Sequence, residues 1–131
     1  MNNMKWSLQQ LHKYGKATFP FETEYDFTEE IKNIDDILGI TPAIVKGNGV
    51  HIRDDRFKFE FHISVILYLQ DAITLDPVEF PLELSVIEIF DKELFDDDTR
   101  LIEKNTIELR DVIWESILLE KPMRVVKDET Q

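Results

Sequence analysis

The sequence contains no cysteine, which excludes disulfide bonds and thiolate metal sites from its 131 residues. Its three histidines, His12, His51 and His62, lack the short spacings by which a metal site can be read from sequence. No apolar run is long enough for a membrane-spanning helix, and no signal peptide is visible. These absences predict a cytoplasmic protein that holds no metal or cofactor and is not inserted in a membrane.

Catalytic motifs are also missing. The four glycines form neither a nucleophile elbow nor a phosphate-binding loop, and Gly47-Asn48-Gly49 is too short to cradle a phosphate. Glu79 and Glu83 share one strand phase at a spacing that paired carboxylates can use for hydrolysis, but that phase is the solvent-facing one. We therefore expect no enzymatic activity and assign no catalytic residue.

Basic residues are scarce as well. The chain has 15 lysines and arginines against 27 acidic residues, so its formal net charge is −12 and its pI is about 4.6. This field repels a phosphate backbone and favours partners of positive charge, such as ribosomal proteins. The alternative is that the excess of acid only keeps a small protein soluble.

Two long alternating stretches dominate what is present. In residues 57–69 apolar side chains occupy every second position, and residues 78–90 begin with the same period. Each pattern indicates a strand with one buried face. Ile87 and Ile89 break the alternation, which indicates a bulge or an edge position. Strands of this length are expected to bend into a half-closed barrel.

The N-terminal half predicts two short helices. Ser7 to Gln10 match a capping box, so the first helix is expected over residues 8–14 and should stop at Gly15. Helical spacing of isoleucines between Thr28 and Gly39 predicts the second.

Two further strands complete the expected sheet. Residues 19–27 alternate but include Pro20, which indicates an edge strand. Residues 43–52 should pair with the strand at 57–69 through a turn at residues 53–56. Gly47 and Gly49 then mark a bulge or a site of close packing.

The C-terminal third contains the candidate partner-binding residues. Residues 91–105, with Asp96, Asp97 and Asp98, predict an acidic mobile loop, and residues 109–120 predict a helix that Pro122 stops. Trp114 and Leu118 point away from the main apolar face, and Arg110 lies near Trp114. Either both sides of the helix are core, against the sheet and the N-terminal helix, or the second side is an anchor for a partner.

The patterns together predict an α+β fold in a single domain over residues 1–131. A bent antiparallel sheet forms a partial barrel, short helices precede it, a C-terminal helix packs on its apolar face, and residues 121–131 form a tail. The residues expected to be buried are Phe59, Phe61, Ile63, Val65, Leu82, Leu84, Val112, Ile113 and Ile117.

Several short motifs occur in an order that resembles a known family. They are Lys5-Trp6-Ser7-Leu8, Ile40-Thr41-Pro42, Val45-Lys46-Gly47, Leu67-Tyr68-Leu69, Thr74-Leu75-Asp76-Pro77-Val78, Ile107-Glu108-Leu109 and Leu118-Leu119-Glu120-Lys121-Pro122. In this order they resemble the YceD family, the large ribosomal RNA subunit accumulation proteins, and most of all its YlbN branch.

The resemblance implies a non-enzymatic factor in ribosome biogenesis that supports accumulation of large-subunit ribosomal RNA. Many members carry a cysteine and an arginine where this chain has Asp71 and Ile73, so a thiol or metal function does not transfer. The acidic balance favours binding of a basic ribosomal protein or a large-subunit precursor over direct RNA contact. A binding module for an unrelated protein partner is the alternative.

Overall fold

The computed structural model describes residues 4–93, 97–122 and 124. Along the chain the elements are β1 (Lys5–Ser7), α1 (Leu8–Lys13), β2 (Phe19–Tyr25), the 3-10 helix η1 (Glu30–Asn33), β3 (Ile37–Ile40), β4 (Ala43–Arg53), β5 (Arg56–Gln70), β6 (Pro77–Asp91), β7 (Thr99–Leu101), β8 (Thr106–Glu108) and α2 (Arg110–Glu120).

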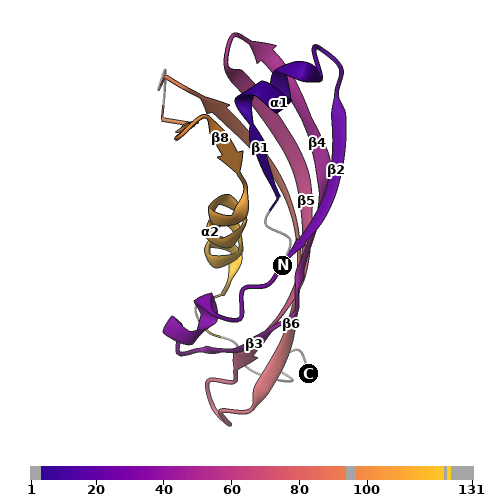
Figure 1. Cartoon of the computed structure of the whole chain (residues 1–131). Coiled ribbons are helices and arrows are strands. Elements are labelled where there is room, and N and C mark those ends of the chain that lie inside the picture. Colours follow the sequence, from indigo (N-terminus) through magenta and orange to yellow (C-terminus); the bar gives the residue numbers. More distant parts are fainter. Residues whose placement is uncertain (1–3, 94–96, 123, 125–131) are drawn as a thin grey trace.

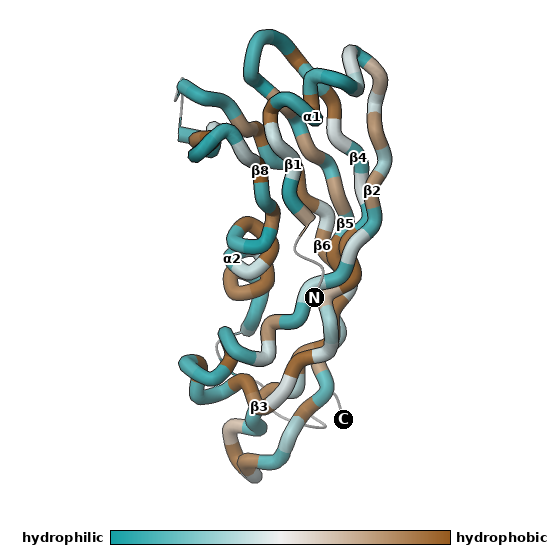
Figure 2. The backbone as a smooth tube through the Cα atoms, in the orientation of Figure 1, coloured by the Kyte–Doolittle hydropathy of each residue, from teal (hydrophilic) through white to brown (hydrophobic). Residues whose placement is uncertain are grey.

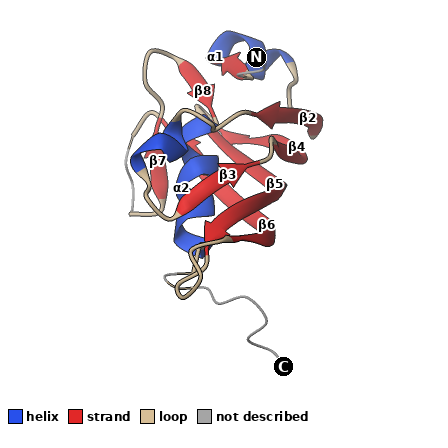
Figure 3. Ribbon diagram, turned by 90° about the horizontal axis from the view of Figure 1, so that it is seen from below, coloured by secondary structure: helices blue, strands red, loops and turns tan. Residues whose placement is uncertain are grey.

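A curled sheet of strand order β2-β4-β5-β6-β7 forms a half-barrel, and β3 pairs with β5 at one end (Figure 1). Every pair in it is antiparallel except β6 with β7. The helix α2 lies against one face of the curled sheet (Figure 3). The predicted α+β class and partial barrel are therefore confirmed.

The two long strands have the predicted phase. β5 and β6 pair from Phe57 opposite Phe90 to Gln70 opposite Pro77 without a register shift. The inner face of β5 is buried. Hydrophilic residues lie at the β4–β5 turn (Figure 2). No bulge occurs at Ile87. The broken alternation instead reflects the edge of the sheet, where Ile87 is 62% exposed.

Close packing explains the glycines of β4. A Cβ atom at Gly47 would lie 2.1 Å from the carbonyl oxygen of Glu60, and one at Gly49 would lie 2.3 Å from the Phe19 ring. Neither glycine forms a hairpin turn. The turn lies between Arg53 and Arg56, as predicted.

The first predicted helix is confirmed. Ser7 caps α1, because its side chain accepts a hydrogen bond from the backbone N–H of Gln10, and Gly15 follows with φ of 64°. The preceding strand β1 was not predicted. It pairs with β8 and places Trp6 against the rings of Phe21 and Phe59.

The second predicted helix is largely wrong. Only Glu30–Asn33 is helical, as one 3-10 turn, and Ile37–Ile40 form β3 instead. Ile37 is buried and pairs with Leu69, so a long-range strand pair outweighs the weak preference of a short isolated helix.

The predicted loop at residues 91–105 contains a strand. β7 pairs in parallel with the end of β6, and Ile102 is buried with its N–H donating to the Asp91 carbonyl. The open edge of β6 supplies the backbone partners that a single-sequence pattern does not reveal. Mobility of the segment stays a prediction, and residues 94–96 lie outside the described residues.

The expected core is confirmed with one exception. Leu84 is half-buried, because within the described residues no strand pairs with the outer side of β6 before Ile89. The predicted tail is described only at residues 121, 122 and 124. Among the described residues, no helix is long and apolar enough to cross a membrane.

Candidate functional site

The predicted acidic cluster is described in part. Asp97 and Asp98 form an exposed turn directly before β7, and Asp96 lies outside the described residues. The register pairs Thr99 with Ile89, so this turn approaches the edge of the sheet beside β6.

Arg110 begins α2 and joins it to the segment after β2. Its guanidinium donates to Glu30 at 3.0 Å from Nε and 2.8 Å from Nη2, and to the Asp26 carbonyl at 2.6 Å. It also lies 4.7 Å from the centre of the Phe27 ring. A half-buried arginine with these contacts positions the helix.

Trp114 and Leu118 continue the same side of α2. The Trp114 ring stacks on Phe27 with centroids 5.1 Å apart, and both residues are partly buried against the core. The second side of the helix therefore packs inside the protein, against Phe27 rather than against α1. Contact with a partner at this position stays a prediction.

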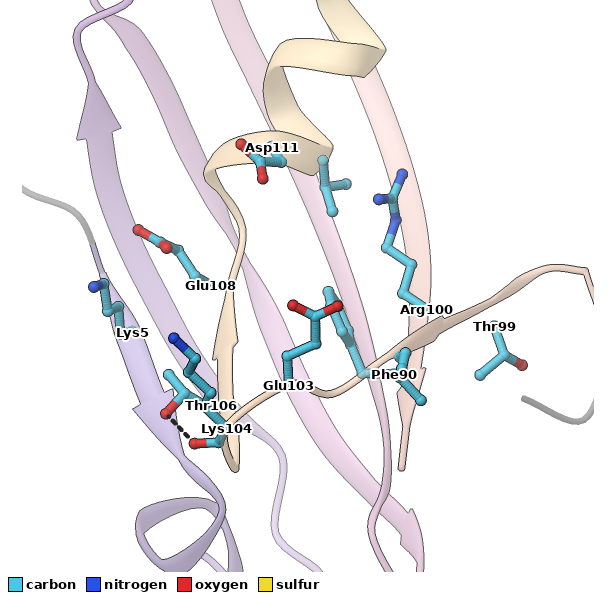
Figure 4. Close-up of a pocket in the computed structure, with 11 residues that line it drawn as sticks. Lys5, Phe90, Thr99, Arg100, Glu103, Lys104, Thr106, Glu108 and Asp111 are labelled. Atoms are coloured by element: carbon cyan, nitrogen blue, oxygen red, sulfur yellow. Dashed lines mark hydrogen bonds between the residues drawn. The ribbon is translucent and has the colours of Figure 1, made fainter. Parts of the chain in front are cut away.

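A groove of about 740 Å³ lies between the β7–β8 segment and the start of α2 (Figure 4). Its lining carries both signs of charge, with Lys5, Arg100 and Lys104 against Glu103, Glu108 and Asp111. Sequence reasoning missed this groove because β7 and β8 were not predicted.

Arg100 is held between two carboxylates. It donates from Nη2 to Glu115 at 2.6 Å and from Nε to Glu88 at 3.0 Å. The hydrogen bond to Glu115 and the charge of Glu88 raise the pKa of Arg100, although burial opposes them. The groove thus presents basic and acidic side chains in equal number, three of each.

A polar network lies on the outer face of the sheet. His62 Nε2 lies 2.5 Å from Glu83 Oε1, Ser64 donates to the other Glu83 oxygen, and the Ser85 hydroxyl lies 3.4 Å from His62 Nδ1. The bonds from His62 and Ser64 lower the pKa of Glu83. These residues do not line the groove beside β7. The sequence did hold a signal for this network, because the alternation places positions 62, 64, 83 and 85 on the same face of two paired strands.

Asp71 stands where the resemblance to the YceD family would place a cysteine, and it has a structural role here. Asp71 is buried, and its Oδ1 accepts the backbone N–H groups of Ile73 and Thr74 at 2.7 and 2.8 Å. Its carboxylate thereby shapes the connector between β5 and β6. A cavity of about 230 Å³ adjoins it, beside the ion pair of Lys121 and Asp36. Within the described part of the chain, no group of three or more acidic or histidine side chains is arranged to hold a metal.

Comparison with known proteins gives one informative relative. The chain is 35% identical to "Uncharacterized protein YlbN" of Bacillus subtilis (strain 168) over 132 residues, covering 98% of this chain and 76% of the relative. No family model matches, and no solved structure matches. Identity at this level over nearly the whole chain shows common descent, and the protein belongs to the family of Bacillus subtilis YlbN.

Proposed function

We propose that this protein is a non-enzymatic assembly factor of the large ribosomal subunit. It supports accumulation of large-subunit ribosomal RNA by binding a basic ribosomal protein or a precursor particle in the cytoplasm. The resemblance of its short motifs to those of the YceD family supports this role.

The distribution of charge carries the preference for a protein partner. Seven basic side chains are tied to carboxylates of the same chain, namely Lys32, Lys46, Arg56, Lys58, Arg100, Arg110 and Lys121. These are seven of the 15 lysines and arginines, and the net charge of −12 means that the overall field repels phosphates. Basic proteins, in contrast, are attracted by the overall field and by the turn at Asp97 and Asp98.

Salt-dependent binding tests the preference. The purified protein is titrated separately with protein-free large-subunit ribosomal RNA and with purified basic large-subunit proteins. We expect saturable binding to a protein only. Changing Asp96, Asp97 and Asp98 to asparagine should slow association and flatten its salt dependence without unfolding the chain.

A matched control removes three carboxylates elsewhere. Glu22, Glu24 and Glu60 lie in outward strand positions, and their change to glutamine alters net charge by the same amount. Tight binding to free RNA that the aspartate substitutions leave intact would contradict the proposal.

A further inference from the structure

β6 is an edge strand over most of its length. It pairs with β7 only at Ile89, Phe90 and Asp91, and among the described residues no strand pairs with its outer side between Pro77 and Glu88. Unpaired strand edges are templates for addition of another strand.

The hydrogen bonds of Ile66 on β5 show which backbone groups of β6 face the open edge. Its N–H donates to Thr41 Oγ1 at 2.9 Å, and its carbonyl accepts the Thr41 N–H at 3.0 Å, so neither group points to its β6 partner Pro81. Antiparallel partners exchange both bonds or neither. The odd-numbered residues of β6 therefore turn their backbone groups to the open edge, as Asp91 does when its carbonyl accepts from Ile102.

Three residues of this phase offer both donor and acceptor. They are Glu83, Ser85 and Ile87, between Pro81 and the start of β7. Pro81 has no N–H and thus already breaks the edge at one end. The stretch is long enough for a short strand.

The inner side chains of the same stretch are incompletely covered. Leu84 and Val86 are half-buried, whereas their β5 partners Ile63 and Phe61 are buried. An added strand would cover these two side chains and continue the row that β7 begins.

The charge of the edge indicates its occupant. β6 carries four acidic residues and no lysine or arginine. Glu88 and Asp91 pair with Arg100 and Arg56, so the open charge comes from Glu79, Glu83 and the turn at Asp97 and Asp98 at the end of the open stretch. Protected edges usually carry lysine. A second copy of this chain would set acidic strand against acidic strand, so a basic strand is the complementary partner.

We propose that the β6 edge at Glu83–Ile87 binds an extended segment of the basic partner protein, in which apolar residues alternate with lysine or arginine. The segment adds as a strand, with its apolar side chains on Leu84 and Val86 and its cations toward the acidic edge. This inference rests on the proposed function, since it names the surface that the basic partner uses.

Amide exchange on the full chain tests the surface directly. The probe is a blocked peptide of alternating lysine and valine. At saturation, exchange of the Glu83, Ser85 and Ile87 amides should slow by roughly tenfold or more, because each becomes hydrogen-bonded. Failure of the peptide to bind, or binding that leaves these three amides unchanged, would overturn the inference. Protection that instead rises with protein concentration alone, together with dimers in sedimentation, would assign the edge to a second copy.

Substitutions at one position separate the backbone effect from the side chain. Ser85→Pro removes an outward N–H in the phase where Pro81 is tolerated, and it should weaken peptide binding by about tenfold. Ser85→Thr keeps the N–H and the hydroxyl and should bind like wild type. Glu22→Pro makes the corresponding change on the opposite edge of the sheet, at β2, and should also bind like wild type.

The two proposals fail in different ways. If Ser85→Pro folds and still joins large-subunit precursors as wild type does, the surface is wrong and the function stands. If wild type joins no precursor while the peptide protects the three amides, the function is wrong and the surface stands.

Discussion

At the scale of residues, the lack of a side chain at Gly47 allows β4 to pair closely with β5. A Cβ atom there would meet backbone of β5, which cannot move without breaking the ladder. Gly47→Ala should therefore lower the free energy of unfolding by about 1–3 kcal/mol or more. Urea denaturation measures it. Gly39→Ala is the control, since its Cβ would meet only Tyr68 at 3.4 Å, and an equal loss in both variants would contradict this explanation.

Arg110 joins α2 to the segment after β2 through Glu30, the Asp26 carbonyl and the Phe27 ring. Arg110→Met should cost about 2–4 kcal/mol of unfolding free energy, because it leaves partly buried polar groups without their partner. Lys32→Met removes an exposed pair with Glu29 and should cost less than about 0.5 kcal/mol in the same titration.

Because of Tyr25, the free energy of unfolding should fall at alkaline pH. Burial, with the nearby charge of Glu108, raises the pKa of Tyr25 from 10.0 to about 12. Above pH 10 the unfolded chain releases the phenolic proton first, so the free energy of unfolding falls as pH rises toward 12, by roughly 2–3 kcal/mol from this group. The difference between wild type and Tyr25→Phe, followed by denaturation from pH 8 to pH 12, isolates this contribution. A difference independent of pH would refute it.

At the scale of elements, local periodicity was sufficient for some parts and insufficient for others. The alternation of β5 and β6 and the capped start of α1 depend on neighbours in sequence, so the pattern alone predicted them. β3 and β7 lie where distant strands offer free backbone groups, at Ile66 and Gln70 of β5 and at Asp91 of β6, and no local pattern reports that. The groove beside β7 was missed for the same reason, whereas the outer-face network had a signal in the shared phase of positions 62, 64, 83 and 85.

The helix α2 provides a test of its buried face. Ile113→Ala should destabilise the protein by about 2–5 kcal/mol, because its side chain lies fully inside the core. Leu119→Ala should be nearly neutral, since Leu119 is 84% exposed. Similar losses for the two variants would mean that α2 packs with another face.

At the scale of the whole molecule, the protein is a half-barrel with an acidic open edge, and its net charge is −12. Purified protein should contain no stoichiometric zinc or iron, because Asp71 uses its carboxylate to hold the connector. Elemental analysis checks this expectation. One zinc per chain would show that the position retains a metal role.

The proposed role of the protein is to assist assembly of the large subunit through a protein contact. Sedimentation of cell extracts through a sucrose gradient, with the protein detected in each fraction, tests it most directly. We expect co-migration with immature large-subunit particles, absence from mature ribosomes, and loss of co-migration at high salt. Protein that stays at the top of the gradient at every salt concentration, in cells that accumulate such particles, would contradict it.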